Sequence, residues 1–402
     1  MSTAARASLR RQAGVEQRTT NLELFYDLVF VFAVTQVSHL LLGHLSWEGA
    51  GQAALVLLVV WWSWNYTTWV TNELDPDSLL VRALLIALML ATLLMAIAIP
   101  EAFGHEALLF ALCYVAIQVG RHTFLTFVAA GPGTIERERA ARILTWFIAA
   151  GALWIAGGIA DGAARTALWL AALALDYGAP FVTFWLPGRP PLDASAWEVG
   201  SGHFAERFQL FIIIALGETI AVTGATTSEL QLTAATLTAF ALAFLSTAAL
   251  WWLYFSLVAT IAERRLAQAQ NRTLLARDAY TYLHVVIVAG IILTAVGDEL
   301  VIAHPSSELG SAELVAVVCG PALYLLAHVA LRLRMTGTIG GRRLAGALAS
   351  LPVALIGLFS PALVVAALLV VVLVGVIAAD MVVAVRRRRR GDPSPLERLG
   401  GA

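Results

Sequence analysis

Runs of about 20 apolar residues recur along almost the whole chain, from residue 24 to residue 385. A run of this length, wound as an α-helix, crosses the roughly 30 Å of hydrocarbon in a bilayer. The composition agrees, because 59% of the residues are hydrophobic and only 13% are charged. Since a membrane span must satisfy its backbone polar groups internally, the runs predict an all-α integral membrane protein.

The apolar runs predict twelve transmembrane helices. Their approximate ranges are 24–45, 52–72, 79–99, 107–128, 142–159, 165–186, 207–224, 235–260, 279–302, 312–333, 343–358 and 361–385. All 26 basic residues are arginines, and with an inner N terminus only Arg165 of the loop arginines falls on the outer side. This positive-inside asymmetry predicts that both termini are cytoplasmic.

The two ends of the chain are polar and basic. Residues 1–20 lack an apolar core before a small-residue cleavage site, so we expect no removable signal peptide. The run RRRRR at 386–390 directly follows the last predicted span. A basic run in that position favours an anchor for anionic lipids over a nucleic-acid-binding patch.

The two halves of the sequence resemble each other. ELFYDLVFVFAVTQV at 23–37 aligns without gaps with ERFQLFIIIALGETI at 206–220. Further matches in the same order are Trp61-Trp62 with Trp251-Trp252, Cys113 with Cys319, and His122 with His328. Six spans per half predict two parallel repeats. The expected organisation is a cytoplasmic tail at 1–20, a first six-helix repeat at 21–186, a cytoplasmic linker at 187–205, a second repeat at 206–385 and a basic cytoplasmic tail at 386–402.

Several motifs together resemble the bacterial low temperature requirement protein A family. They are NLELFYDLVFVFAVTQVSHLL at 21–41, WWSWNYTTWVTNELDPD at 61–77, AIPEAFG at 98–104, LDYGAPF at 175–181, ERFQLFIIIALGETI at 206–220 and RDAYTYLH at 277–284. The resemblance runs nearly end to end and implies a multi-pass protein of the bacterial inner membrane. Its name describes a growth phenotype and no chemistry.

A fainter similarity is to the potassium-channel family of bacteria and lysosomes that is built from six-helix units. FYDLVFVFAVT looks like the first helix of that family, which carries Arg-x-x-x-Phe-Ser-Asp. The departures are Asn21 in place of the arginine, Tyr26 in place of the serine, and Leu210 where the second half would need the aspartate.

Ionisable residues inside apolar spans are candidates for function, because a charge at the bilayer centre costs at least about 2.5–3.5 kcal/mol. Glu218 and Asp176 each lie near the middle of a predicted span. Gly217 and Gly224 flank Glu218 and predict close approach by another helix. Pro180 predicts a kink after Asp176. We expect the two acids to be ion or solute sites, although each could instead fix helix packing.

A second set of polar residues lies toward the inner ends of the predicted spans. Asp27 and Glu23 belong to it, and Asp27 could pair with Arg82 or Arg277 at the inner surface. The gate or relay candidates are Asp27, Glu23, Asn65, Arg82, His122, His284, His328, Arg277 and Asp278, with Arg121 beside them. Histidines in such positions can relay protons near neutral pH or simply hydrogen-bond within the packing.

The loop TNELDPDS at 71–78 leaves an enzymatic alternative open. Glu73, Asp75 and Asp77 are oxygen ligands of the kind that Mg²⁺ prefers, as in membrane enzymes that bind an isoprenoid diphosphate. The second half has no matching acidic loop, and the acids could pair with Arg82 or cap the next helix. No cofactor is expected outside this alternative.

The function that these patterns favour is transport or permeation of a small cation, proton or solute. The alternatives are an intramembrane enzyme acting on an isoprenoid diphosphate or another lipid, and a sensor that transports nothing. The expected partners are the lipid bilayer and a small ion or solute, without nucleic acid. The pattern leaves a homo-oligomer open.

Overall fold

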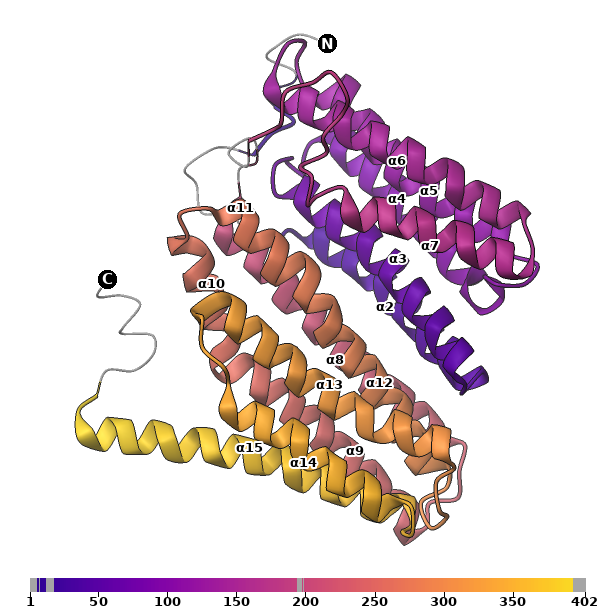
Figure 1. Cartoon of the computed structure of the whole chain (residues 1–402), viewed down its shortest axis with the longest axis vertical. Coiled ribbons are helices and arrows are strands. Elements are labelled where there is room, and N and C mark those ends of the chain that lie inside the picture. The colour runs from indigo at the N-terminus through magenta and orange to yellow at the C-terminus, as the bar shows by residue number, and fades with distance from the viewer. Residues whose placement is uncertain (1–5, 7, 12–17, 194–196, 198, 393–402) are drawn as a thin grey trace. The chain divides into compact units, whose positions relative to one another are not determined.

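The computed structural model describes residues 6, 8–11, 18–193, 197 and 199–392 (Figure 1). In this part of the chain the regular structure is helical, with two isolated β-bridges and no β-strand. The chain divides into two compact units, which are described separately. Unit 1 contains Met1–Leu40 and Glu48–Arg207, and unit 2 contains Leu41–Trp47 and Phe208–Ala402. The predicted tails at 1–20 and 386–402 lie partly outside the described residues.

Unit 1 is built on the first half of the helices. They are α2 (Asn21–Gly43), α3 (Trp47–Thr71), α4 (Leu79–Ala98), η1 (Ile99–Glu101), α5 (Ala107–Phe124), η2 (Leu125–Ala129), α6 (Ile135–Ile159) and α7 (Gly162–Gly178). Helices α4, α5, α6 and α7 pack against one another in chain order. Helix α6 begins where Thr134 Oγ1 accepts a hydrogen bond from the Arg137 backbone N–H at 3.3 Å, which satisfies one of the free donors at a helix start.

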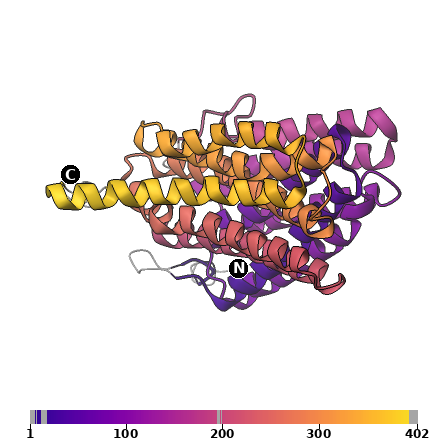
Figure 2. The same ribbon diagram turned by 90° about the horizontal axis from the view of Figure 1, so that it is seen from below.

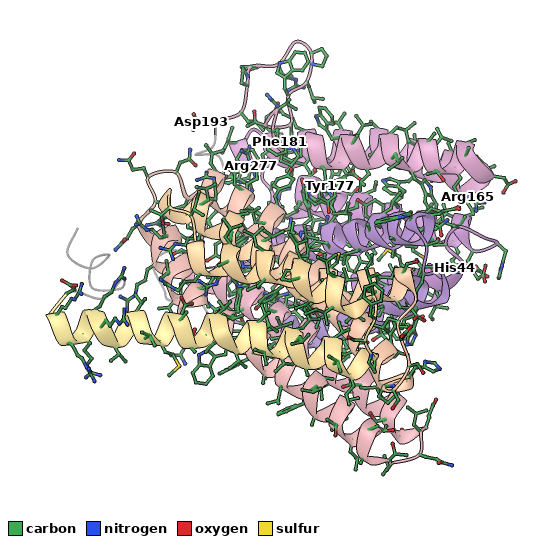
Figure 3. The ribbon with its side chains drawn as sticks, turned by 60° about the horizontal axis from the view of Figure 1, so that its bottom comes forward. His44, Arg165, Tyr177, Phe181, Asp193 and Arg277 are labelled. Carbon is green, nitrogen blue, oxygen red and sulfur yellow. The ribbon has the colours of Figure 1, made fainter. Side chains whose placement is uncertain are left out.

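Helix α7 is held at both ends, and Figure 3 labels the two residues that do so, Arg165 and Tyr177. Arg165 pairs with Asp161 and donates to the backbone carbonyl of Gly104 at 3.1 Å, which fixes the turn before α5. Tyr177 OH donates to the carbonyl of Leu58 on α3 at 2.8 Å.

The predicted sixth span, 165–186, is too long at its C-terminal end. Helix α7 ends at Gly178, and residues 179–184 form turns. Pro180 explains the stop, because proline has no backbone N–H and cannot donate a helical hydrogen bond. The polypeptide then turns through Thr183 and Phe184, both with positive φ. Asp176 therefore lies in the last turn of its helix and not at its middle.

Unit 2 contains most of α8 and all later elements. They are α8 (Ser201–Ser228), α9 (Ala234–Leu253), η4 (Tyr254–Val258), α10 (Ala259–Gln268), α11 (Arg272–Leu275), η5 (Ala276–Leu283), α12 (His284–Ala303), α13 (Ser311–Thr336), α14 (Gly341–Gly357) and α15 (Ala362–Arg390). Turns of π-helix form η4 and η5, as well as η2 of unit 1. Helices α12 to α15 pack in chain order, and α9 contacts both α12 and α15.

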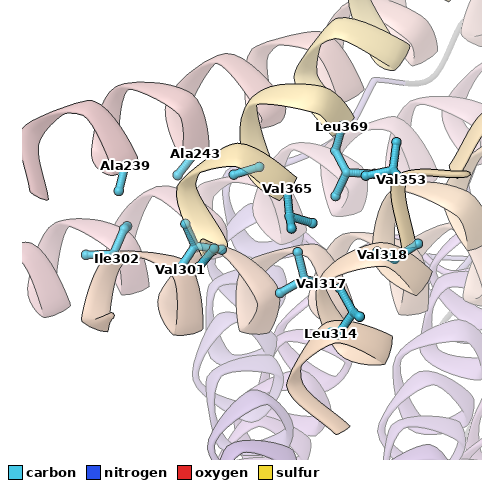
Figure 4. Packing of buried hydrophobic residues seen from close by; sticks show 12 residues of the cluster. Ala239, Ala243, Val301, Ile302, Leu314, Val317, Val318, Val353, Val365 and Leu369 are labelled. Atoms are coloured by element: carbon cyan, nitrogen blue, oxygen red, sulfur yellow. The ribbon is translucent and has the colours of Figure 1, made fainter. Parts of the chain in front are cut away.

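The core of unit 2 is a cluster of aliphatic side chains between α9, α12, α13, α14 and α15 (Figure 4). Helices α12 and α13 approach closely at glycines. A Cβ placed on Gly290 would lie 2.7 Å from the backbone nitrogen of Tyr324, and one on Gly320 would lie 2.6 Å from that of Thr294. Small residues at helix contacts allow this packing, which stabilises helix pairs inside a bilayer.

Nine helical segments of the described residues are long and apolar enough to cross a membrane. The other three predicted spans also form helices. Helices α7 and α14 have 17 residues each, and α3 carries Ser63, Asn65 and several threonines in its second half. Figure 2 shows α15 as one long helix, drawn in yellow. The last turn of this helix carries arginines. The prediction of a polytopic all-α membrane protein is confirmed, and the count of twelve stays a prediction.

Candidate functional site

Glu23, in the first turn of α2, carries a fully buried carboxylate (0% exposed). Its Oε2 accepts hydrogen bonds from Arg11 Nη2 and from the backbone N–H of Thr20, both at 2.9 Å. Its Oε1 lies 2.9 Å from His203 Nε2 and 3.2 Å from Arg207 Nη1. One side chain thus joins the segment before α2, α2 itself and the start of α8.

Asp27 follows one helical turn later and is also fully buried. Its Oδ1 accepts hydrogen bonds from Arg207 Nη2 at 2.5 Å and from Trp64 Nε1 at 2.7 Å. Within the described residues its Oδ2 has no hydrogen-bond partner. Residues four apart lie on one face of a helix, so the single guanidinium of Arg207 neutralises both Glu23 and Asp27. We call Arg11, Glu23, Asp27, His203 and Arg207 the ionic cluster.

His203 is oriented by its second ring nitrogen. Nδ1 lies 3.1 Å from the amide nitrogen of Asn72, whose own oxygen accepts from the backbone N–H of Gly200 at 2.9 Å. The Asn72 amide nitrogen can only donate, so Nδ1 is the acceptor of that bond. Nε2 lies between Glu23 Oε1 at 2.9 Å, which can only accept, and Arg11 Nη2 at 3.0 Å, which can only donate. The loop after α3 therefore helps to position the ionic cluster.

A second buried group surrounds Arg121, on α5. Arg121 Nη1 donates to the Ser63 carbonyl at 3.1 Å and to Thr67 Oγ1 at 3.0 Å, and Nη2 donates to Gln118 Oε1. Tyr26 OH donates to the same Thr67 hydroxyl at 2.8 Å. This group links α2, α3 and α5 through polar side chains in the interior of unit 1.

Asp176 has a different environment from the acids of the ionic cluster. Its side chain is 3% exposed, and Oδ2 accepts hydrogen bonds from Tyr114 OH at 2.7 Å and Trp154 Nε1 at 2.9 Å. Its Oδ1 has no hydrogen-bond partner in the part of the chain that the structure describes. Both donors are neutral, and within the described residues no arginine pairs with this carboxyl group.

In unit 2 the central polar residues are tyrosines and histidines. His284 Nδ1 lies 2.8 Å from the Ala279 carbonyl, and its Nε2 lies 2.9 Å from Tyr254 OH. The carbonyl can only accept, so Nδ1 is the donor and Tyr254 donates to Nε2. Tyr280 stacks on the imidazole with ring centroids 4.8 Å apart. The π-helical backbone of η5 brings Tyr280 and His284 into this stack.

A second buried histidine in unit 2 extends this group of polar side chains to α13. His328 Nδ1 lies 2.9 Å from the Tyr324 carbonyl, one turn earlier. Tyr324 OH donates to the Leu250 carbonyl on α9 at 2.6 Å, and Arg343 donates to the Leu253 carbonyl at 3.1 Å. In unit 1, His122 makes the matching bond with the Gln118 carbonyl at 3.1 Å.

Glu218 is buried near the middle of α8, in unit 2. The next residue, Thr219, shares a hydrogen bond of 2.8 Å with Thr247 on α9. Gly217 and Gly224 predicted that another helix approaches α8 closely at these positions. Within unit 2 this prediction is wrong, because no described atom lies within 4 Å of a Cβ built on either glycine.

The acidic loop after α3 is occupied by ion pairs and turn bonds. Glu73 pairs with Arg139, Asp77 pairs with Arg82 at 3.3 Å, and Asp75 Oδ1 accepts from the Asp77 backbone N–H at 3.0 Å. Among the described residues no group of three or more His, Cys, Asp or Glu side chains could hold a metal ion. The pairing of Asp77 with Arg82 is the alternative that the sequence left open.

The predicted polar residues therefore fall into separate groups. Unit 1 holds Glu23, Asp27, Arg82, His122, Asp176 and Asn65, the last of these buried on α3. Unit 2 holds Glu218, Arg277, Asp278, His284 and His328. Asp278 bridges Arg277 and Arg334, each at 2.8 Å. Asp27 pairs with Arg207, and the suggested partner Arg82 pairs with Asp77 instead.

Sequence reasoning missed Arg11, His203 and Arg207. His203 lies 180 residues from Glu23, and Arg207 lies 180 residues from Asp27, so no local spacing links them. One signal was present, because Arg207 stands at the start of an apolar span within ERFQLF. An arginine there needs an acidic or polar partner.

The long apolar helices and the charged groups buried between them define a polytopic α-helical membrane protein. The chain belongs to the bacterial low temperature requirement A protein (LtrA) family, whose model matches residues 18–378. An uncharacterized protein of Rhizobium meliloti (strain 1021) is 37% identical over 318 residues, which cover 79% of this chain and 78% of that protein. No solved structure matches the chain.

Proposed function

We propose that the protein moves a proton or a small cation across the membrane through carboxyl groups buried among its helices. The observation that carries this proposal is the environment of Asp176. Its partners Tyr114 and Trp154 are neutral, and its Oδ1 has no partner among the described residues. Such a carboxyl group can take up a proton or a cation without first breaking an ion pair. Ionisable side chains within membrane helices are functional by default because their insertion is costly.

The acids of the ionic cluster suit a different role. Glu23 and Asp27 are neutralised by Arg207, and Glu23 also by Arg11. Binding a cation there would require one of these ion pairs to open. We therefore assign the ionic cluster to a gate or an anchor, which holds the start of α8 against α2.

Glu218 is the corresponding candidate in unit 2. It is buried near the middle of a 28-residue helix, about 15 Å from the C-terminal end by the rise of an α-helix. The proposal assigns Glu218 within unit 2 the role in charge movement that it assigns to Asp176 within unit 1.

The proposal includes a topology of twelve spans in two parallel six-helix repeats, in a bacterial inner membrane with cytoplasmic termini. Matching contacts inside the two units support it. In unit 1 a fourth-span side chain, Arg121, donates to the Ser63 carbonyl of the second span. In unit 2 Tyr324 of the tenth span donates to the Leu250 carbonyl of the eighth. His122 and His328 each bond the carbonyl one turn earlier.

Purified protein in liposomes provides the test. Under an imposed potential, a pH-sensitive dye inside the vesicles reports proton entry, and sodium- and potassium-sensitive dyes report cations. We expect a flux above that of protein-free liposomes. Asp176→Asn should remove it, and Glu218→Gln should lower it, because both changes take away a carboxyl group and keep the side-chain shape.

Asp161→Asn is the matched control, since Asp161 precedes the same helix and its side chain is 95% exposed. It should keep the wild-type flux. Wild-type protein without proton or cation flux, or equal fluxes for Asp176→Asn and the wild type, would overturn the proposal.

A further inference from the structure

A short segment near the N terminus docks on the loop after α3, and we call residues 8–11 the N-terminal strap. The Asp75 backbone N–H donates to the Leu9 carbonyl at 2.9 Å, and the Arg11 backbone N–H donates to the Glu73 carbonyl at 3.1 Å. The side chain of Leu9 is buried. Backbone hydrogen bonds and apolar burial therefore hold the strap against unit 1.

The side chain of Arg11 ties the strap to two membrane helices. It is only 9% exposed, and its Nε donates to the carbonyl of Thr71 at 2.8 Å and to that of Leu74 at 3.1 Å. Thr71 is the last residue of α3, where a positive charge interacts favourably with the helix dipole. Nη2 donates to Glu23 Oε2 on α2 at 2.9 Å. One guanidinium thus joins the strap to α3 and α2.

The ionic cluster is electrically neutral only while Arg11 is docked. Arg11 and Arg207 supply two positive charges. Glu23 and Asp27 supply two negative charges, and a neutral imidazole at His203 adds none. Without Arg11, the guanidinium of Arg207 would face both acids alone. The cluster would then carry one uncompensated buried negative charge, which is costly unless another cation replaces it.

Arg11 is also the member of the ionic cluster that lies outside the helices. The other four members belong to α2 and α8, which are long and apolar enough to cross a membrane. Arg11 can therefore leave the cluster without the movement of a membrane helix. Its neighbour Arg10 pairs instead with Glu136 at 3.5 Å, where the two side chains are 36% and 31% exposed.

We propose that Arg11 is a tethered cation, which fills the place of a mobile cation at Glu23 and keeps the inner entrance of unit 1 closed. When the strap leaves, the vacated carboxylate attracts a proton or a small monovalent cation. A monovalent ligand follows from the charge balance, because the loss of one guanidinium leaves one negative charge. The strap thus inhibits in cis the charge movement that we assign to Asp176. This inference rests on the proposed function.

The liposome assay with the full-length protein tests the tethered cation. Arg11→Gln removes its charge and should raise the flux about tenfold, since the loss of a charge-assisted hydrogen bond shifts an equilibrium by about that factor. Arg10→Gln removes an equal charge from the same strap and should keep the wild-type flux. Adding Glu23→Gln to Arg11→Gln removes the uncompensated acid and should restore the wild-type flux. Adding Asp176→Asn should abolish the raised flux, which distinguishes it from a leak.

Release of the strap is measured without any flux by labelling Leu9→Cys with a membrane-impermeant maleimide. The native cysteines are first removed by Cys113→Ser and Cys319→Ser. Because Leu9 is buried, we expect slow labelling that becomes about tenfold faster when Arg11→Gln is added. Leu9→Asp puts a charge at the buried position and leaves Arg11 in place. It should release the strap and raise the flux too, so the test does not depend on the folding of Arg11→Gln.

The outcomes separate this inference from the proposed function. Flux in Arg11→Gln and Leu9→Asp no higher than in the wild type would overturn the tethered cation and leave the proposed function standing. The same holds if labelling is equally fast with and without Arg11→Gln, or if adding Glu23→Gln leaves the flux raised. A wild type without flux counts against the proposed function instead, and the labelling rates then decide whether Arg11 holds the strap.

Discussion

The two units hold their buried helices together by different interactions. Unit 1 buries charged side chains, above all Glu23, Asp27 and Arg207, and joins them by ion pairs. Unit 2 centres on Tyr254 and His284, which form hydrogen bonds, and packs its helices closely at glycines. Each unit thus ties distant helices together, one by ion pairs and the other by hydrogen bonds and close packing.

The contrast shows where charge is concentrated in the protein. A buried ion pair gains little net stability, but the loss of one partner is costly because it leaves the other charge uncompensated. Hydrogen bonds between neutral groups contribute less and cost less when removed. Unit 1 is therefore the part whose stability depends most on individual side chains, and it also holds Arg121 and Asp176.

The largest expected effect comes from removing the arginine that serves two acids. Arg207→Met leaves Glu23 and Asp27 buried with their main counter-charge gone, so the free energy of unfolding should fall by about 3–5 kcal/mol. Denaturant titration in detergent micelles measures this change. Adding Glu23→Gln and Asp27→Asn to Arg207→Met should recover part of the loss.

Arg189→Met is the control for this prediction. Arg189 pairs with Glu138 but its side chain is 58% exposed, so its removal should cost less than about 1 kcal/mol. Equal losses for the two arginines would contradict the ionic interior of unit 1.

A smaller effect is expected from the glycine contact of unit 2. Gly290→Ala puts a methyl group against the Tyr324 backbone, so it should destabilise the α12–α13 pair by about 1–3 kcal/mol. The same titration gives the value. Gly375→Ala on α15 is the comparison, because a Cβ there meets no described atom within 4 Å and alanine favours the helix. A loss for Gly375→Ala as large as that for Gly290→Ala would argue against close packing.

The smallest expected effect comes from removing one tyrosine hydroxyl group in each unit. Tyr114→Phe removes a donor from the carboxyl group of Asp176, and Tyr254→Phe removes one from the imidazole of His284. A hydrogen bond to a charged group contributes about 1.5–3 kcal/mol and one between neutral groups about 0.5–1.5 kcal/mol. We expect Tyr114→Phe to be the more destabilising by about 1 kcal/mol. A larger loss for Tyr254→Phe would reverse the comparison.

Local patterns in the sequence predict the helices well and the pairing of side chains poorly. Apolar length and the polar stretches between runs locate each helix, since both depend on neighbouring residues. The end of α7 was misplaced because apolar residues continue past Gly178, while Pro180 already stops the helix. Asp27 stood out by its position near the start of an apolar run, but its partner Arg207 lies 180 residues away.

The sequence by itself determined the membrane-spanning helical architecture and marked Glu23, Asp27, Asp176 and Glu218 as ionisable residues in apolar surroundings. Hydrophobicity sums over neighbouring residues, so it can be read without knowing the fold. Only the tertiary structure decided that Arg207 neutralises Glu23 and Asp27, whereas Asp176 has neutral donors and Arg121 has no carboxylate beside it among the described residues. Ion pairs and hydrogen bonds act over a few ångströms, and packing alone brings such distant residues that close.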